Sequence, residues 1–185
     1  MRKLTMPELG RKSVSEFKDS KKIPLIIVLD NVRSAHNAGS VFRTADAFSA
    51  EAIYICGITA QPPHREIQKT ALGATETVRW KYFQNTLDAI TELKNNNYKI
   101  ISIEQTTRSI LLNEFASSPG SKYAIVFGNE ASGVDEAVVS VSDLAIEVPQ
   151  SGTKHSLNIA VCAGIVIWDF FKKQIATDSQ IKNAQ

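Results

Sequence analysis

The sequence predicts an α/β fold in which a mostly parallel sheet carries helices on both faces. Three observations indicate this class. Short apolar segments rich in β-branched residues recur along the chain, and segments with helical spacing of apolar residues lie between them. At 185 residues and 43% hydrophobic content, the chain is long enough for one domain with a full core. Strands that alternate with helices are typical of a parallel sheet.

Strands are expected at apolar runs of strand length. Residues 23–29 read IPLIIVL, an almost continuous apolar run that is typical of a strand buried on both faces. Pro24 lies near its start, where a missing N–H group is tolerated. Similar runs with β-branched residues predict strands at residues 52–56, 98–103, 123–127 and 144–148, and a weaker pattern indicates one at residues 78–83.

Helical patterns separate these strands, at residues 37–48, 64–72, 86–95, 134–141 and 156–173. In the first pattern, apolar residues repeat at helical spacing and predict a buried stripe, which leaves Ser40 and Arg43 turned toward the loop side. Asn37 is the expected N-cap of this helix, because a short polar side chain accepts hydrogen bonds from the free N–H groups of a first turn.

The last helical pattern is apolar nearly all round, and Ser156 is its expected N-cap. One sheet face does not account for so much apolar surface, whereas a subunit interface does. Trp80 and Trp168 are expected to lie in the core or at such an interface. The pattern therefore predicts a homodimer.

Charge divides the chain into a basic start and a near-neutral remainder. Residues 1–22 hold seven Lys or Arg against three Asp or Glu, which leaves 14 against 16 in the rest of the chain. Two interpretations remain open: an arm that grips phosphate backbones through counterion release, and an ordinary solvated terminus. We expect residues 1–22 to form a basic arm, residues 23–173 the folded domain and residues 174–185 a tail.

Several classes of protein and site are not expected. No window reaches the ~18 uninterrupted apolar residues of a membrane span, and residues 1–17 mix charges with apolar side chains, unlike a secretory signal. Cys56 and Cys162 lie inside apolar runs, which favours buried reduced thiols and a cytoplasmic location. His36, His64 and His155 have neither the i, i+4 spacing nor the Cys neighbour that zinc favours, so no metal site is predicted.

Three polar loops follow predicted strands, at the carboxyl ends where open parallel sheets collect ligands. They span residues 30–43, 128–133 and 149–158. The second has glycines at Walker A spacing, but Val134 and Asp135 stand where that motif requires Lys and Ser or Thr. No G-x-G-x-x-G sequence follows a strand either. A nucleoside triphosphate loop and the usual dinucleotide fingerprint are therefore both excluded.

Taken singly, the polar residues of these loops leave two interpretations open. Arg43 either meets a phosphate beside the strand end or forms a surface salt bridge. Glu130 is either free to pair with another group or favours the start of the next helix. Ser156 either only caps its helix or also leaves main-chain N–H groups for a polar ligand.

Together, the three loops resemble the three ordered motifs of the SpoU/TrmH family of SPOUT methyltransferases. The segment NAGSVFRTA at residues 37–45 is similar to motif 1, and FGNE at residues 127–130 with Gly133 is similar to motif 2. Pro149, Gly152 and the tripeptide SLN at residues 156–158 are similar to motif 3. The resemblance covers about residues 25–171. It implies a C-terminal deep trefoil knot within the α/β sheet, the SPOUT or alpha/beta knot fold.

The resemblance also implies an activity, namely an RNA 2′-O-ribose methyltransferase that uses S-adenosylmethionine, modifies tRNA or rRNA and acts as a homodimer without a metal. It implies that Arg43 is the catalytic arginine with support from Asn37, and that Glu130, Ser156 and Asn158 order the active site and the RNA. The cofactor-binding residues that it implies are Ile103, Glu104, Gln105, Phe127, Gly128, Asn129, Gly133, Val148, Gln150, Ser156 and Leu157. Gln150 stands where many members have Met, and Val148 where Ile is common.

The chemistry of the reaction sets the expected role of Arg43. A ribose hydroxyl is a poor nucleophile, so the reaction needs tight in-line positioning and help in removing the proton. A guanidinium with a pKa above about 12 is a weak base, so we expect Arg43 to bind the adjacent phosphate and stabilise the developing alkoxide. Two other functions remain open: a catalytically silent RNA-binding protein with this fold, and a SPOUT methyltransferase that modifies a base nitrogen.

Overall fold

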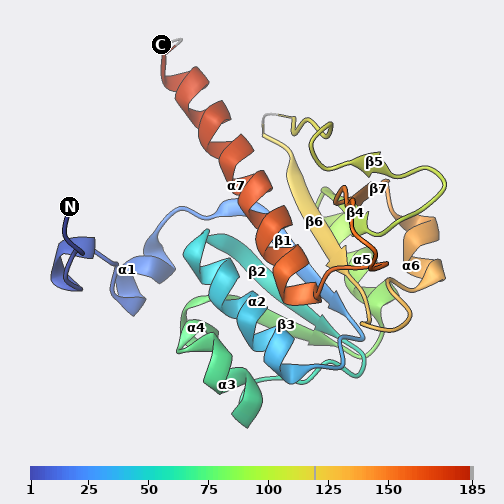
Figure 1. The fold of residues 1–185 in the computed structure, drawn as a ribbon, viewed down its shortest axis with the longest axis horizontal. Coiled ribbons are helices and arrows are strands. Elements are labelled where there is room, and N and C mark those ends of the chain that lie inside the picture. The colour runs from blue at the N-terminus through green and yellow to red at the C-terminus, as the bar shows by residue number, and fades with distance from the viewer. Residues whose placement is uncertain (119, 184–185) are drawn as a thin grey trace.

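All seven strands that the structure describes run parallel in one sheet, in the order β3-β2-β1-β6-β4-β7-β5 (Figure 1). The structure is a computed structural model that describes residues 1–118 and 120–183. The predicted α/β class and each predicted strand are confirmed. The strands are β1 Ile23–Asp30, β2 Ala50–Cys56, β3 Arg79–Phe83, β4 Tyr98–Ile103, β5 Ile110–Leu111, β6 Lys122–Phe127 and β7 Leu144–Glu147.

Helices cover both faces of this sheet (Figure 1). On one face lie α2 (Ala35–Ala47), α3 (Arg65–Ala71), α4 (Ala74–Thr77) and α7 (Ile159–Asn183), and on the other lie α5 (Thr86–Asn95) and α6 (Glu136–Val141). Each predicted helix is present, whereas the N-terminal helix α1 (Val14–Asp19), α4 and β5 were not predicted. Helix α7 continues beyond residue 173 and runs into the expected C-terminal tail as far as Asn183.

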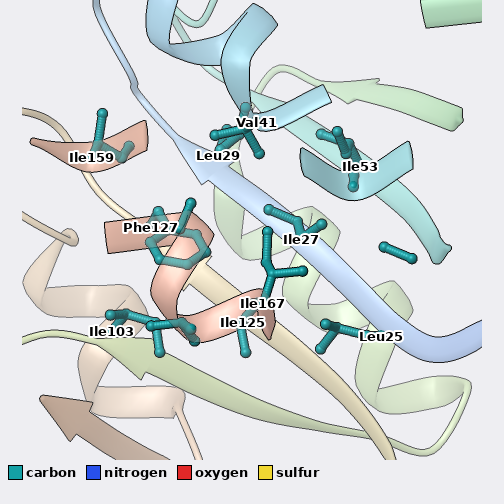
Figure 2. Close-up of a cluster of buried hydrophobic side chains, with 14 of the residues drawn as sticks. Leu25, Ile27, Leu29, Val41, Ile53, Ile103, Ile125, Phe127, Ile159 and Ile167 are labelled. Carbon is teal, nitrogen blue, oxygen red and sulfur yellow. The ribbon is translucent and has the colours of Figure 1, made fainter. Parts of the chain in front are cut away.

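Two apolar clusters, one on each face of the sheet, form the core. Successive side chains of a strand point to opposite faces, so Leu25, Ile27 and Leu29 join one cluster while Ile26 and Val28 join the other. Figure 2 shows the first cluster, where side chains of β1 and β6 meet those of α2 and α7. Burial on both faces explains why residues 23–29 of β1 are apolar without interruption.

The first 22 residues pack partly against the domain. After a 3-10 turn, Pro7–Leu9, helix α1 (Val14–Asp19) begins with a capping box formed by Ser13 and Glu16. Phe17 of this helix is only 7% exposed, and the Lys22 Nζ atom lies 3.3 Å from the centre of its ring. Figure 1 shows this segment beside α4, on the side of the molecule away from β5 and β7.

Two predicted helix caps are wrong. Ser34, not Asn37, caps α2, because its side chain accepts a hydrogen bond from the Asn37 N–H group at 3.2 Å. The final helix begins at Ile159, so Ser156 lies ahead of it. The Asn158 side chain caps that helix by accepting hydrogen bonds from the Ala160 N–H at 2.9 Å and the Val161 N–H at 3.4 Å. The amide of Asn37 is thereby left for a contact outside its own helix.

Candidate active site

A cavity of about 560 Å³ lies at the carboxyl ends of β4, β6 and β7, where a parallel sheet is expected to bind ligands. Its volume is that of a small-molecule site. Three segments line it: residues 103–105 after β4, residues 127–133 after β6, and residues 147–162 around the start of α7. The lining includes each residue predicted to bind the cofactor: Ile103, Glu104, Gln105, Phe127, Gly128, Asn129, Gly133, Val148, Gln150, Ser156 and Leu157.

A tight turn after β6 forms one wall of this cavity. The main chains of Asn129 and Gly133 exchange two hydrogen bonds of 2.9 Å. A Cβ atom on Gly128 would lie 2.1 Å from the carbonyl carbon of Gly133, and Gly133 itself has a φ of +73°. Both positions therefore require glycine, one for close approach and one for backbone conformation. The Asn129 Nδ2 atom donates to the Asn31 carbonyl at 2.8 Å and ties the turn to the end of β1.

Glu104, the first residue after β4, fixes the opposite end of this turn. Its Oε2 atom accepts a hydrogen bond from the Val134 N–H at 3.0 Å, and its Oε1 atom accepts one from the Gln105 N–H at 2.9 Å. The Gln105 Nε2 atom in turn donates to the His155 carbonyl at 2.9 Å. Residues after β4 thus hold both the glycine turn and the loop that precedes α7.

Glu130 joins the three loops. Its carboxylate accepts hydrogen bonds from the Arg33 N–H at 2.9 Å, the Ser34 N–H at 3.1 Å and the Asn37 amide at 3.0 Å. Asn158 donates from its Nδ2 atom to the Asn37 Oδ1 atom at 3.3 Å. Of the two interpretations of Glu130, pairing with another group is the one observed. Asn37, Glu130 and Asn158, which are far apart in the sequence, form one hydrogen-bonded chain.

This pairing affects the ionisation of Glu130. Partial burial raises the pKa of its carboxyl, but the hydrogen bonds from Arg33, Asn37 and Ser34 outweigh burial and hold the pKa below its usual range. The carboxylate is therefore ionised at neutral pH and acts as an acceptor only.

Arg43 lies outside the cavity of its own chain. It is exposed on α2, as the helical pattern predicted, but it is not among the residues that line the cavity. Among the side chains that the structure describes, those of residues 1–118 and 120–174, its guanidinium finds no hydrogen-bond or ion-pair partner, so a surface salt bridge is not observed there. Gly39, one turn earlier, packs against Ile67 and Thr70 of α3, so that side of α2 faces α3. Ser156, in contrast, lies exposed at the cavity.

Sequence reasoning missed several residues of the cavity wall. They are Ala131, Ser132, Glu147, Ile159 and Cys162. Cys162 follows Asn158 by one helical turn, so helix periodicity would have placed it on the same face. Burial, with a further effect of the nearby Glu104 charge, raises the pKa of the Cys162 thiol to about 11. Cys162 is thus a neutral thiol that forms part of the wall.

Two further findings concern the described part of the chain only. In it, no three His, Cys, Asp or Glu side chains gather where they could hold a metal ion. None of its helices is both long and apolar enough to span a membrane.

A model of the SpoU rRNA Methylase family matches residues 24–168 of this chain. A putative TrmH family tRNA/rRNA methyltransferase of Staphylococcus saprophyticus is 28% identical over 161 residues, which cover 87% of this chain and 64% of that protein. The 23S rRNA (guanosine-2'-O-)-methyltransferase RlmB of Neisseria meningitidis serogroup B is 29% identical over 158 residues, which cover 85% of this chain and 62% of that protein. The chain thus spans less than two thirds of the length of these relatives.

Solved structures share the fold. A TrmH/SpoU tRNA modifying enzyme of A. aeolicus superimposes with a TM-score of 0.78 at 24% identity, covering 89% of this chain and 82% of that one. The SpoU methyltransferase AviRb of Streptomyces viridochromogenes, solved in complex with the cofactor AdoMet, superimposes with a TM-score of 0.76 at 18% identity, covering 85% of this chain and 60% of that one.

Proposed function

Since this chain belongs to the SpoU rRNA methylase family, we propose that it is an S-adenosylmethionine-dependent RNA 2′-O-ribose methyltransferase that acts on tRNA or rRNA. One observation carries the proposal: two of the three loops predicted to form the site line one cavity, and hydrogen bonds join Asn37 of the first loop to Glu130 and Asn158 in the cavity wall. The name of the N. meningitidis relative, a guanosine-2'-O-methyltransferase, supports the ribose as acceptor.

The cavity suits the proposed cofactor. S-adenosylmethionine supplies an electrophilic methyl group on a sulfonium when it is bound. The close contact of Gly128 with Gly133 brings main chain to the cavity surface, where a side chain would occupy the space. Carboxylates, amides and hydroxyls from the three segments offer hydrogen bonds along the wall, as expected for a small polar ligand. The eleven predicted residues given above would hold it.

The residues of the hydrogen-bonded chain position the acceptor. Glu130 fixes the Asn37 amide and the start of α2, and Asn37 fixes Asn158 at the start of α7. Ser156 and Asn158 then lie at the cavity, where the exposed Ser156 is left to contact the RNA while the Asn158 amide joins Asn37 to the first turn of α7. Such preorganisation lowers the barrier because the groups need little rearrangement when substrate arrives.

Arg43 binds the RNA phosphate next to the target ribose and stabilises the developing alkoxide. A planar guanidinium presents several N–H donors and keeps its charge, which suits a phosphate and excludes a role as base. Its guanidinium has no partner among the side chains of residues 1–118 and 120–174, which leaves it for an RNA ligand. Because Arg43 does not line the cavity of its own chain, we propose that the Arg43 of a second chain completes the site.

Helix α7 offers an interface for that second chain. Val161, Ile165 and Trp168 are 53%, 40% and 49% exposed, and their spacing places them in one stripe of the helix. Trp168 packs against Phe48, just past the end of α2, with ring centres 5.5 Å apart, so the stripe lies close to the helix that carries Arg43. We propose a homodimer through this stripe. A monomer in sedimentation at micromolar concentration would contradict it.

The family resemblance also underlies a proposal about the backbone, namely that the C-terminal part of the chain forms the deep trefoil knot of the SPOUT fold. The segments after β6 and β7, which line the cavity together with residues 103–105, are the ones that such a knot would involve.

A transfer assay tests the proposed function. Purified chain, total RNA and tritiated S-adenosylmethionine are incubated, and RNA is collected on filters. We expect tritium in RNA with the wild-type chain and none with Arg43→Ala. RNA that is retained by the protein without becoming labelled would instead indicate a catalytically silent RNA-binding protein.

A further inference from the structure

The Glu104 carboxylate is held in a fixed orientation at the cavity. Its main-chain N–H group donates to the Ile146 carbonyl at 3.0 Å, and its two carboxylate oxygens accept from the Val134 and Gln105 N–H groups. A Cβ atom on Gly133 would lie 2.2 Å from the Glu104 Oε2 atom, so the carboxylate packs closely against the glycine turn. The main chains of Val134 and Gln105 therefore fix the positions of the two Glu104 carboxylate oxygens.

Each of these oxygens keeps capacity for one more hydrogen bond. An ionised carboxylate has about four acceptor positions, and the main chain uses one on each oxygen. Glu104 is only half-buried and lines the cavity, as does Cys162, whose thiol pKa is raised first by burial and then by the Glu104 charge. The remaining acceptor positions thus belong to a carboxylate that faces the ligand space.

We propose that Glu104 recognises the vicinal hydroxyls of a ribose in the cavity, with one hydroxyl donating to each oxygen. This inference rests on the proposed function, because the nucleoside part of S-adenosylmethionine is the ribose that the cavity would hold. Two neighbouring acceptors of fixed orientation match two neighbouring hydroxyl donors. An acidic side chain near the carboxyl ends of a parallel sheet is a known solution for binding the ribose of a dinucleotide.

Glu147 is the matched comparison in the same wall. It is half-buried, carries the same charge and lines the cavity from the end of β7. Its side chain makes no hydrogen bond with the described residues, so its two oxygens are free to rotate. A carboxylate that is free to rotate still binds a point charge such as an ammonium group. It binds a diol less well, because its two oxygens must first be fixed in one orientation. The specificity for hydroxyls is therefore assigned to Glu104 alone.

Calorimetric titration of the full chain tests this assignment. The probes are S-adenosylhomocysteine and its 2′-deoxy and 3′-deoxy forms, and the readout is the ratio of dissociation constants within each variant. For the wild-type chain we expect each deoxy probe to bind about 10- to 100-fold more weakly, because a charged acceptor loses its partner. In Glu104→Gln and Glu104→Ala the ratio falls to within about threefold, and in Glu147→Gln it keeps the wild-type value.

The outcomes separate this inference from the proposed function. Wild-type chain that binds S-adenosylhomocysteine and both deoxy probes equally well would overturn the role of Glu104 and leave the methyltransferase proposal standing. A hydroxyl preference that survives in both Glu104 variants would overturn it as well. Absence of binding of S-adenosylmethionine and S-adenosylhomocysteine to the wild-type chain would contradict the proposed function itself, and the inference with it.

Discussion

Single residues hold the loops of the site together, and Glu130 makes the most of these contacts. One carboxylate accepts from the Arg33 and Ser34 main chain and from the Asn37 amide, so it links the glycine turn to the first turn of α2. Hydrogen bonds to a charged acceptor are stronger than those between neutral groups. The stability of this link therefore depends on the ionisation of Glu130.

Glu130→Gln should destabilise the fold. The new side chain keeps one acceptor oxygen, but its NH2 group would face N–H donors that now bind the carboxylate. Glu130 is exposed, so we expect a loss of only about 1 kcal/mol in the free energy of unfolding at pH 7. Folding lowers the pKa of the Glu130 carboxyl. The stability of the wild-type chain relative to the variant is therefore fully present above the pKa of Glu130 in the unfolded chain, and it is lost as pH falls through the pKa of Glu130 in the folded chain. Urea unfolding at pH 7 and at a pH below about 4 measures the difference in free energy of unfolding between wild type and variant. An equal difference at the two pH values would contradict a dependence on the charge of Glu130.

Arg43→Lys tests the role of the planar guanidinium. Lysine keeps the positive charge but loses the fork of N–H donors, so RNA binding should change little while turnover falls on the order of 100-fold. Filter binding and the tritium transfer assay give the two quantities on the same samples. Near-normal turnover with unchanged RNA binding would show that charge alone is sufficient.

The sequence predicted most of the residues that meet, with the exception of Arg43, but not how each one is held. Ser34 and Asn37 are both good cap residues three positions apart, and the choice between them depends on Glu130, which lies far along the chain. Glu104 was placed at the cavity, yet its contact with the Val134 N–H joins two loops that no local pattern connects. The position of Arg43 outside its own cavity is a further tertiary result of this kind.

Helices α2 and α3 pack closely against each other at Gly39. A Cβ atom on Gly39 would lie 2.1 Å from the Thr70 Oγ1 atom and 2.5 Å from the Ile67 carbonyl oxygen. The hydroxyl belongs to a side chain that is able to move, but the carbonyl belongs to the helix backbone. Gly39 therefore sets how near the helix that carries Arg43 lies to α3.

Gly39→Ala should lower the free energy of unfolding by roughly 1–3 kcal/mol, since the two helices must move apart. Adding Thr70→Ala should not restore the loss, because the Ile67 carbonyl still blocks the new methyl group. Thr70→Ala alone serves as the control and loses the hydrogen bond to the His36 carbonyl. Urea denaturation of the three variants measures the effect. Recovery in the double variant would mean that only the side chain opposes the methyl group.

The long and buried helices and strands were predicted from the sequence, and the short ones were not. β1 and β6 are apolar because both faces are covered, so their sequences alone indicated buried strands. β5 has two residues and α4 has four, which is too short for a periodic pattern to appear. α1 does carry a signal in its sequence, the capping box of Ser13 and Glu16, although this helix was not predicted.

For the whole molecule, the position of Arg43 makes the subunit arrangement testable through activity. If Arg43 of one protomer completes the cavity of its partner, two inactive variants should complement each other. We pair Arg43→Ala with Gly128→Val, which distorts the glycine turn, and purify heterodimers through two different tags. Each heterodimer then has one intact site and should show about half the wild-type rate.

Each variant alone, as a homodimer, is the control and should show no transfer. A heterodimer as inactive as its parents would place Arg43 and the cavity of the same chain in one site, contrary to the arrangement proposed. Circular dichroism of each homodimer excludes misfolding as the cause of inactivity.

The proposed function requires that this cavity deliver a methyl group to a ribose hydroxyl of RNA. The most direct test is to incubate the chain with S-adenosylmethionine and total RNA, digest the RNA to nucleosides and identify the products by mass spectrometry. A nucleoside whose added methyl group fragments with the ribose is the predicted result. Methylation that fragments with the base, or no new methylated nucleoside, would contradict the claim.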